Sequence, residues 1–196
     1  MKNKIRFAAL IYMFLLLFVT EAYSQNTGIH TNALYWLTTT PNAGMDFRAG
    51  SKSTVGFTIG YNPFRFPSYT KDGTVHNPKF ANWFFVPEYR YWLRRPYERW
   101  FIGGYALYGE YNIEGFPFMH SEKFRYKGIA AGGGISAGFQ WALGERWGVE
   151  LSAGLGYTYI RYDKFDCGAC GELKETDKRH WIGPNKLSLT FIYYIQ

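Results

Sequence analysis

The chain has 196 residues, enough for one domain with a sizeable core, and a formal net charge of +7 at pH 7. Aromatic residues make up 21% of it and 22 positions are glycine. This composition favours β-structure, because aromatic side chains fit strands and glycine lets strands bend. A modest basic excess can indicate nucleic-acid binding, but the export segment described next argues against nucleic acid. We assign the excess to solvated loops that also meet anionic lipid headgroups.

Residues 1–24 have the pattern of a signal peptide. A basic start is followed by an apolar run over 7–19, and small residues at Ala22 and Ser24 predict cleavage before Gln25. The run is too short to span a bilayer comfortably as a helix, so an uncleaved anchor is the weaker alternative. No cysteine stands directly after the predicted cut, which argues against a lipoprotein. We therefore take residues 25–196 as the mature domain.

Eight segments of the mature domain show the period-two alternation of β-strands, seen best in "WGVELSAGLGYTYIRY". The segments run 29–38, 43–49, 54–62, 80–93, 100–113, 124–142, 147–162 and 181–195. Tight connections at 50–54, 94–99 and 143–146 alternate with longer ones at 63–79, 114–123 and 163–180, with 39–42 as a short exception. The pattern predicts an all-β protein: an eight-stranded antiparallel up-and-down transmembrane β-barrel in the outer membrane, with both termini periplasmic.

The segment "WFFVPEYRYWL", residues 83–93, combines aromatic and charged residues. Its aromatic side chains mostly share one parity, whereas Glu88, Arg90 and Trp92 share the other. In a barrel the first set faces lipid and the second faces the lumen. Pro87 has the lipid parity and cannot donate a ladder hydrogen bond, so we expect a β-bulge there.

The same parity argument assigns side chains on the other strands. The predicted lipid-facing aromatics are Trp83, Phe85, Tyr89, Tyr91, Trp147, Tyr157, Tyr159, Phe191 and Tyr193. The predicted lumen ion-pair network is Asp46, Arg48, Glu88, Arg90, Glu110 and Glu150, together with Gln140. Eight strands leave an interior that side chains can fill, so this network is expected to plug the lumen. Strand one stays ambiguous: either Tyr35 and Leu37, or Leu34 and Trp36, face lipid.

Two sets of residues raise the question of catalysis. Paired carboxylates can serve as general acid and base, but buried ion pairs explain the same pattern, and we prefer that explanation. The consecutive residues His120, Ser121 and Glu122 match the residue types of outer-membrane esterases. Three adjacent residues do not readily point at one another, and a triad is defined by geometry. We therefore predict no catalytic residues, with a lipid esterase or deacylase near His120 as the alternative.

The only cysteines, Cys167 and Cys170, form a C-x-x-C pair in the last long connection. A thioredoxin-type site needs a βαβ unit, and zinc usually needs two such pairs, although Asp166 and His180 lie near in sequence. We expect a loop disulfide in an oxidising compartment, with a reduced pair as the alternative. No metal and no cofactor are expected.

Several stretches together resemble a family of small outer-membrane proteins of Bacteroidota, catalogued as domain of unknown function 3575 (DUF3575). They are "HTNALYWLTTTPNAGMDFRAG", "TIGYNPF", "FVPEYRYWL", "GEYNI", "WALGERWGVELSAGLGYTYIRYDKFDCGACG" and "GPNKLSLTFIYYI". The resemblance covers nearly the whole mature domain. It implies an outer-membrane β-barrel, in some members fused to a peptidoglycan-binding domain, and it implies no activity. We expect no such C-terminal extension here.

The sequence thus predicts a small non-enzymatic barrel of the cell envelope that presents surface loops for envelope structure, adhesion or docking. Its expected partners are outer-membrane lipid and another surface or envelope protein. A third reading, a soluble lipocalin-like barrel, predicts an apolar interior and a polar outside.

Overall fold

A computed structural model describes residues 27–64, 67, 69–71, 74–76, 78–114, 124–166 and 173–195. The predicted signal peptide, the His120–Glu122 trio and the cysteine pair lie outside these residues. Within the part that the structure describes, no helix has the length and apolarity needed to cross a bilayer.

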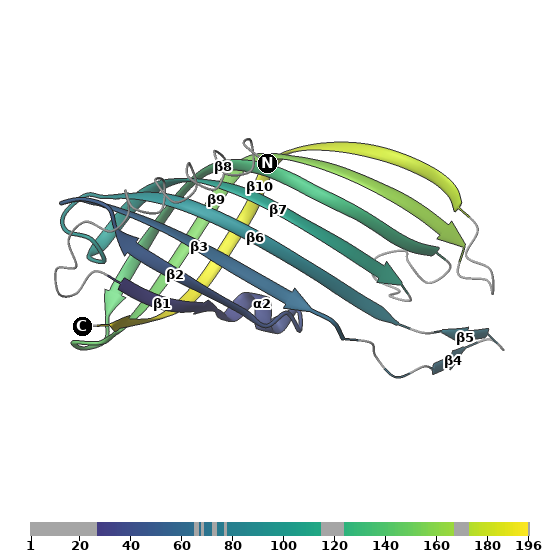
Figure 1. Cartoon of the computed structure of the whole chain (residues 1–196), viewed down its shortest axis with the longest axis horizontal. Coiled ribbons are helices and arrows are strands. Elements are labelled where there is room, and N and C mark those ends of the chain that lie inside the picture. The colour runs from purple at the N-terminus through teal and green to yellow at the C-terminus, as the bar shows by residue number, and fades with distance from the viewer. Residues whose placement is uncertain are drawn as a thin grey trace, which may run out of the picture.

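Eight antiparallel strands form one closed, ring-like sheet, in the order β1-β10-β9-β8-β7-β6-β3-β2 (Figure 1). The strands are β1 (Thr27–Asn32), β2 (Asn42–Arg48), β3 (Ser53–Asn62), β6 (Lys79–Trp92), β7 (Arg99–Glu114), β8 (Phe124–Ala142), β9 (Trp147–Asp166) and β10 (Leu173–Ile195). Sequence neighbours pair throughout, and β1 closes the ring by pairing with both β10 and β2. The all-β class and the eight antiparallel strands are therefore confirmed.

The two ends of the ring differ in their connections. Short connections at 49–52, 93–98 and 143–146 lie at the end where Thr27 pairs with Ile195; we call this the short-turn end. The connections at the opposite end, which we call the long-loop end, include the three longest, at 33–41, 63–78 and 115–123. A small hairpin, β4 (Tyr69–Lys71) and β5 (Thr74–His76), lies in the connection between β3 and β6, where the sequence predicted only a loop.

The first predicted strand, 29–38, is wrong beyond Asn32, because a short helix, α2 (Ala33–Leu37), follows β1. The Asn32 side chain accepts a hydrogen bond from the backbone N–H of Leu34 at 3.0 Å, which caps the helix. Neither of the two predicted facings for residues 34–37 applies, because these residues are not part of a strand. Tyr35 instead packs against Phe84, with ring centroids 4.5 Å apart.

Ladder pairing between β1 and β10 stops at Asn32 and Thr190. Beyond that point, β10 has no strand on this side among the described residues. The Asn32 side chain accepts from the backbone N–H of Leu189 at 3.1 Å, and α2 contacts β10. On the other side of β10, the ladder with β9 has a bulge between Pro184 and Lys186. Bulges and proline are devices that discourage edge-to-edge pairing.

The bulge predicted at Pro87 is wrong. Pro87 pairs with Phe57 on β3 in unbroken register. On the β7 side, the pairs Phe85–Tyr108 and Glu88–Tyr105 also keep one register across the proline. The strand accommodates the missing N–H of Pro87 by leaving ladder positions on the β7 side unpaired, so no extra residue is inserted.

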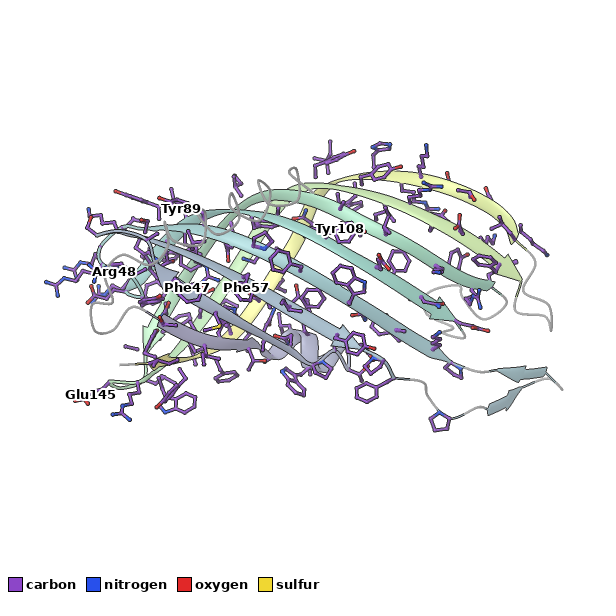
Figure 2. The ribbon with its side chains drawn as sticks, viewed as in Figure 1. Phe47, Arg48, Phe57, Tyr89, Tyr108 and Glu145 are labelled. Atoms are coloured by element: carbon purple, nitrogen blue, oxygen red, sulfur yellow. The ribbon has the colours of Figure 1, made fainter. Side chains whose placement is uncertain are left out.

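The ring is apolar outside and polar inside. Among the described residues only four hydrophobic side chains are buried, against sixteen polar or charged ones. Large apolar side chains stand instead on the outer face of every strand, as Figure 2 shows for Phe47, Phe57 and Tyr89. This is the reverse of the distribution that a soluble lipocalin-like barrel requires.

Candidate functional site

The interior of the ring holds a cluster of charged side chains centred on Arg90 of β6. Its Nη1 lies 3.1 Å from Asp46 Oδ2 on β2 and 3.3 Å from Glu150 Oε2 on β9, and its Nη2 lies 2.7 Å from Glu88 Oε2. Nε of Arg90 donates a further hydrogen bond to Glu88 Oε2 at 2.8 Å. The guanidinium also lies over the Phe101 ring, 5.2 Å from its centroid. All four charged residues are buried, so solvent screens these contacts little.

Two further residues complete the cluster. Lys186 Nζ of β10 binds Glu88 Oε1, which also accepts a hydrogen bond from Ser136 Oγ at 2.6 Å. His30 Nδ1 of β1 lies 3.0 Å from Asp46 Oδ2. The cluster therefore joins strands on opposite sides of the ring and ties them together across the lumen.

Glu150 is the least satisfied member. Both of its carboxylate oxygens are buried without a hydrogen-bond partner, although Oε2 lies within ion-pair distance of Arg90. The neighbouring Gln140 donates to the Tyr194 hydroxyl and leaves its own Oε1 without a partner. Three carboxylates thus share one guanidinium and one amine, and Glu150 has the poorest set of contacts.

Aromatic side chains seal the cluster at the short-turn end. Trp92 and Phe101 are buried with ring centroids 4.9 Å apart, and Trp92 Nε1 donates to Thr54 Oγ1 at 3.0 Å. Tyr97, in the turn between β6 and β7, folds inward with its backbone at φ 67° and donates to the backbone oxygen of Asp46 at 3.2 Å. Burial, followed by the nearby Asp46 carboxylate, raises the pKa of Tyr97. The short-turn end is therefore closed by packed rings.

A cavity of about 210 Å³ lies on the other side of the cluster, toward the long-loop end. Tyr35 of α2 lines it together with Phe84, Tyr105 and Leu107, and Lys186 forms part of its wall. The Tyr105 hydroxyl donates to Asn185 Oδ1, and Lys186 lies 5.1 Å from the centre of the Tyr105 ring. Side chains thus fill the middle of the lumen, and a cavity lies between them and the long-loop end.

The structure brings together four of the six residues predicted for the lumen network: Asp46, Glu88, Arg90 and Glu150. Gln140 also points inward and is buried. The assignments of Arg48 and Glu110 are wrong. Arg48 ends β2 at the short-turn end, where it is exposed and its Nε donates to the backbone oxygen of Gly50 at 3.0 Å (Figure 2). Glu110 is exposed on the outer face beside Tyr108, because Phe101 and Tyr105 fix the odd positions of β7 inside.

Sequence reasoning missed His30 and Lys186. Lys186 has the same parity as Ser188 and Thr190, so extending that alternation by one step would have found it. His30 lies on the strand whose facing was left open. The register of β1 on β2 decides it, since His30 pairs with Gly44, and a Cβ at Gly44 would come within 2.1 Å of His30 Nε2.

The nine aromatics predicted to face lipid all have outward parity on their strands. Seven are exposed, at 37–55% of their surface, whereas Tyr159 and Tyr193 are half-buried. Tyr193 packs against Trp147 with ring centroids 5.0 Å apart, and Tyr159 packs against His180 at 5.4 Å.

One arrangement in the lumen has the order of a catalytic triad. His30 contacts Asp46 through Nδ1, and its Nε2 lies 3.1 Å from Thr58 Oγ1. A hydroxyl, an imidazole and a carboxylate in this order can activate a nucleophile. However, Thr58 lines neither the cavity at Tyr35 nor the outer grooves of the ring, and Arg90 already binds the same Asp46 oxygen. Among the described residues no group of three or more His, Cys, Asp or Glu side chains is placed to hold a metal ion.

Comparison with protein families places the chain in a family. The model of a family described as "Protein of unknown function (DUF3575)" matches residues 10–195. No curated protein and no solved structure matches the chain. The family match includes every strand of the ring and every residue of the luminal cluster.

Proposed function

We propose, on the premise that this chain belongs to the DUF3575 family of proteins of unknown function, that it is a non-enzymatic outer-membrane β-barrel. Its lumen is closed by the Arg90 cluster, and its longer connections stand at the cell surface for envelope structure, adhesion or docking of a surface partner. The observation that carries this proposal is a continuous band on the outer face that contains no charged side chain.

The band is clearest on β9. Its outward residues from Trp147 to Tyr159 are Trp, Val, Leu, Ala, Leu, Tyr and Tyr, and the next outward residue is Arg161. The step from Trp147 to Tyr157 rises about 33 Å along the strand, or about 25 Å along the axis of a barrel whose strands tilt by about 40°. That height matches the apolar band of outer-membrane barrels, and rings of aromatic residues at both limits match their interfacial girdles.

The other strands repeat the pattern. Outward residues of β7 from Trp100 to Tyr108 and of β8 from Trp141 to Ile129 carry no charge. An apolar surface that continues across several strands is typical of a membrane or protein interface, whereas soluble monomers rarely expose large contiguous apolar patches. A closed sheet also satisfies the backbone groups that hydrocarbon cannot hydrogen-bond. These features support insertion in a membrane, after export directed by the signal peptide predicted over 1–24.

The cluster supports a closed barrel in preference to a channel. Its charged groups are bound to one another across the lumen, and Trp92, Tyr97 and Phe101 pack beneath them. A hydrated ion has no continuous path through such an interior.

Quenching of tryptophan fluorescence by lipids with brominated acyl chains tests the proposal. The chain has seven tryptophans, so variants that retain a single one give site-specific signals. In reconstituted bilayers we expect strong quenching of Trp147, which is 55% exposed, and none of Trp92, which is fully buried. An unquenched Trp147 in folded protein would contradict membrane insertion.

A second candidate function, hydrolysis of a lipid ester, rests on the Asp46–His30–Thr58 order. Thr58→Val removes the only hydroxyl in it, so this candidate predicts loss of lipid-ester hydrolysis in the reconstituted protein. Our proposal predicts that wild type and Thr58→Val both leave the lipids intact.

A further inference from the structure

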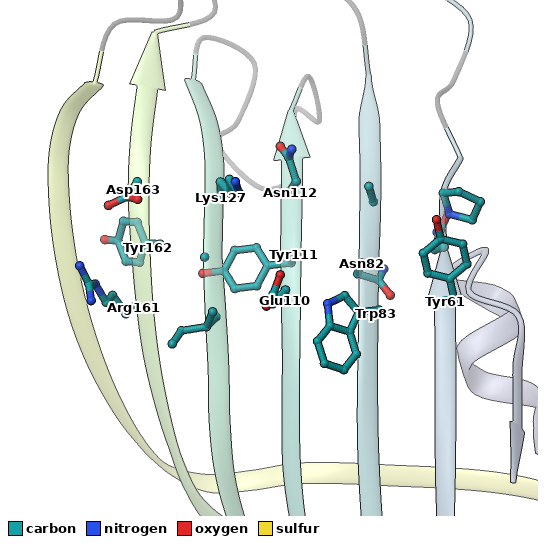
Figure 3. Close-up of a pocket in the computed structure, with 15 residues that line it drawn as sticks. Tyr61, Asn82, Trp83, Glu110, Tyr111, Asn112, Lys127, Arg161, Tyr162 and Asp163 are labelled. Atoms are coloured by element: carbon teal, nitrogen blue, oxygen red, sulfur yellow. The ribbon is translucent and has the colours of Figure 1, made fainter. Parts of the chain in front are cut away.

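A second hollow, of about 410 Å³, lies near the long-loop end across β3, β6, β7, β8 and β9 (Figure 3). On β6 to β9 its lining residues form triplets in which the outer two positions have outward parity, such as Glu110–Asn112 and Arg161–Asp163. The middle residues turn inward and supply the floor. The hollow is therefore a groove on the outer face of the ring, and we call it the upper groove.

The upper groove lies just above the uncharged band. Arg161 follows Tyr159 on the outward face of β9, and Lys127 follows Ile129 on that of β8. Trp83 and Tyr108, whose ring centroids are 5.5 Å apart, belong to the aromatic limit of the band on β6 and β7. In a barrel that spans the membrane, which this inference takes from the proposed function, the groove is level with the headgroups of the outer leaflet.

Three cations form a row beside this groove. Arg161 of β9 is directly opposite Lys178 of β10, and Lys127 of β8 is diagonal to Arg161. Like charges directly opposite one another destabilise an antiparallel pair. No ion pair within 4.0 Å is found for these three side chains among the described residues. Asp163, opposite Lys127, instead accepts a hydrogen bond from Thr176 at 2.7 Å. A bound anion would relieve this repulsion.

The remaining lining groups accept hydrogen bonds. Asn112 Oδ1 is buried and has no hydrogen-bond partner, which is costly unless a ligand donates to it. The Glu110 and Asp163 carboxylates are further acceptors at the same level. A simple phospholipid phosphate would use the cations and leave these acceptors unused, whereas a sugar supplies hydroxyl donors for them.

We propose that the upper groove binds the phosphorylated saccharide headgroup of a membrane glycolipid. The phosphate lies between Lys127 and Arg161, with Lys178 adjacent. Sugar hydroxyls donate to Asn112 and Glu110, and the first carbons of the acyl chains pass over Trp83 onto the uncharged band.

Binding is measured on the full chain in nanodiscs of zwitterionic lipid, by native mass spectrometry and by titration with four probes. The probes are a diphosphorylated, acylated glucosamine disaccharide, the same glycolipid without phosphates, phosphatidylglycerol, and free glucosamine 6-phosphate. We expect the phosphorylated glycolipid to bind at least tenfold more tightly than each of the others. Equal binding of phosphatidylglycerol would overturn the saccharide assignment, and equal binding of the dephosphorylated glycolipid would overturn the phosphate site.

The double variant Lys127→Gln/Arg161→Gln should weaken glycolipid binding at least tenfold. The matched control, Lys52→Gln/Arg146→Gln, removes two exposed cations at the short-turn end and should bind as wild type. Unchanged binding by the first variant would overturn the proposal. Quenching of Trp147 distinguishes failure of this site from failure of the proposed function. A quenched Trp147 without glycolipid binding would overturn this site alone, whereas an unquenched Trp147 would overturn the membrane assignment.

Discussion

Arg90 and Glu88 illustrate how a buried charge becomes tolerable. Each has more than one partner: Arg90 meets three carboxylates, and Glu88 meets Arg90, Lys186 and Ser136. Removing one partner of a buried ion pair leaves the other charge uncompensated, which costs more than the pair itself contributes. Glu88 and Glu150 should therefore differ in how much their replacement costs, because the Glu150 oxygens have no hydrogen-bond partner.

We therefore expect Glu88→Gln to lower the free energy of unfolding by about 3 kcal/mol, since it leaves the largely buried Lys186 without a counter-charge. Glu150→Gln should cost less than about 1 kcal/mol, because Arg90 keeps Asp46 and Glu88. Urea titrations of folded protein in detergent measure both. Glu145→Gln, in the exposed turn labelled in Figure 2, is the control and should change nothing. Equal losses for Glu88→Gln and Glu150→Gln would contradict this ranking.

At the scale of elements, glycines on adjacent strands differ in how much space the neighbouring backbone leaves for a side chain. A Cβ added to Gly134 of β8 would come within 2.2 Å of the Leu155 backbone oxygen on β9, whereas one added to Gly104 of β7 meets nothing closer than 3.9 Å. The run of glycines in β8 therefore reflects close contact with the neighbouring backbone, which cannot move away as a flexible side chain can.

Gly134→Ala should destabilise the protein by about 1–3 kcal/mol, because the β8–β9 ladder must shift to admit the methyl group. Gly104→Ala, a matched change on the adjacent strand, should be neutral or slightly stabilising. Thermal unfolding followed by circular dichroism compares the two. The close-approach argument fails if both variants unfold at the same temperature.

The outer face of β9 provides the second test at this scale. Leu151 lies midway between Trp147 and Leu155 and is 47% exposed. Leu151→Arg should lower the free energy of unfolding in bilayers by about 2–4 kcal/mol, because a charge near the midplane of a barrel's lipid face is destabilising. Leu143→Arg places the same charge in an exposed turn and should fold as wild type. Normal folding of Leu151→Arg in bilayers would place β9 outside the membrane.

At the scale of the whole molecule, the proposed function requires a ring that is closed to passage, although a cavity lies between the cluster and the long-loop end. We expect the purified protein in planar bilayers to show no steady ion current above the bare membrane. The double variant Arg90→Ala/Trp92→Ala removes the central cation and the largest ring beneath it, so that folded variant should conduct. A wild-type current of single-channel size would contradict the closed lumen.

Alternation along the chain is enough to predict the class of fold, most strand positions and the inward set Asp46, Glu88, Arg90 and Glu150. The period-two pattern indicates on which of the two faces of a strand each side chain lies, and it can be read from neighbouring residues alone. The end of β1 at Asn32, the inward facing of His30 and the outward facing of Glu110 follow only from the folded ring. They depend on register and on a capping asparagine, which are set by pairing with strands distant in the chain. For the same reason, the row formed by Lys127, Arg161 and Lys178 exists only once β8, β9 and β10 are paired.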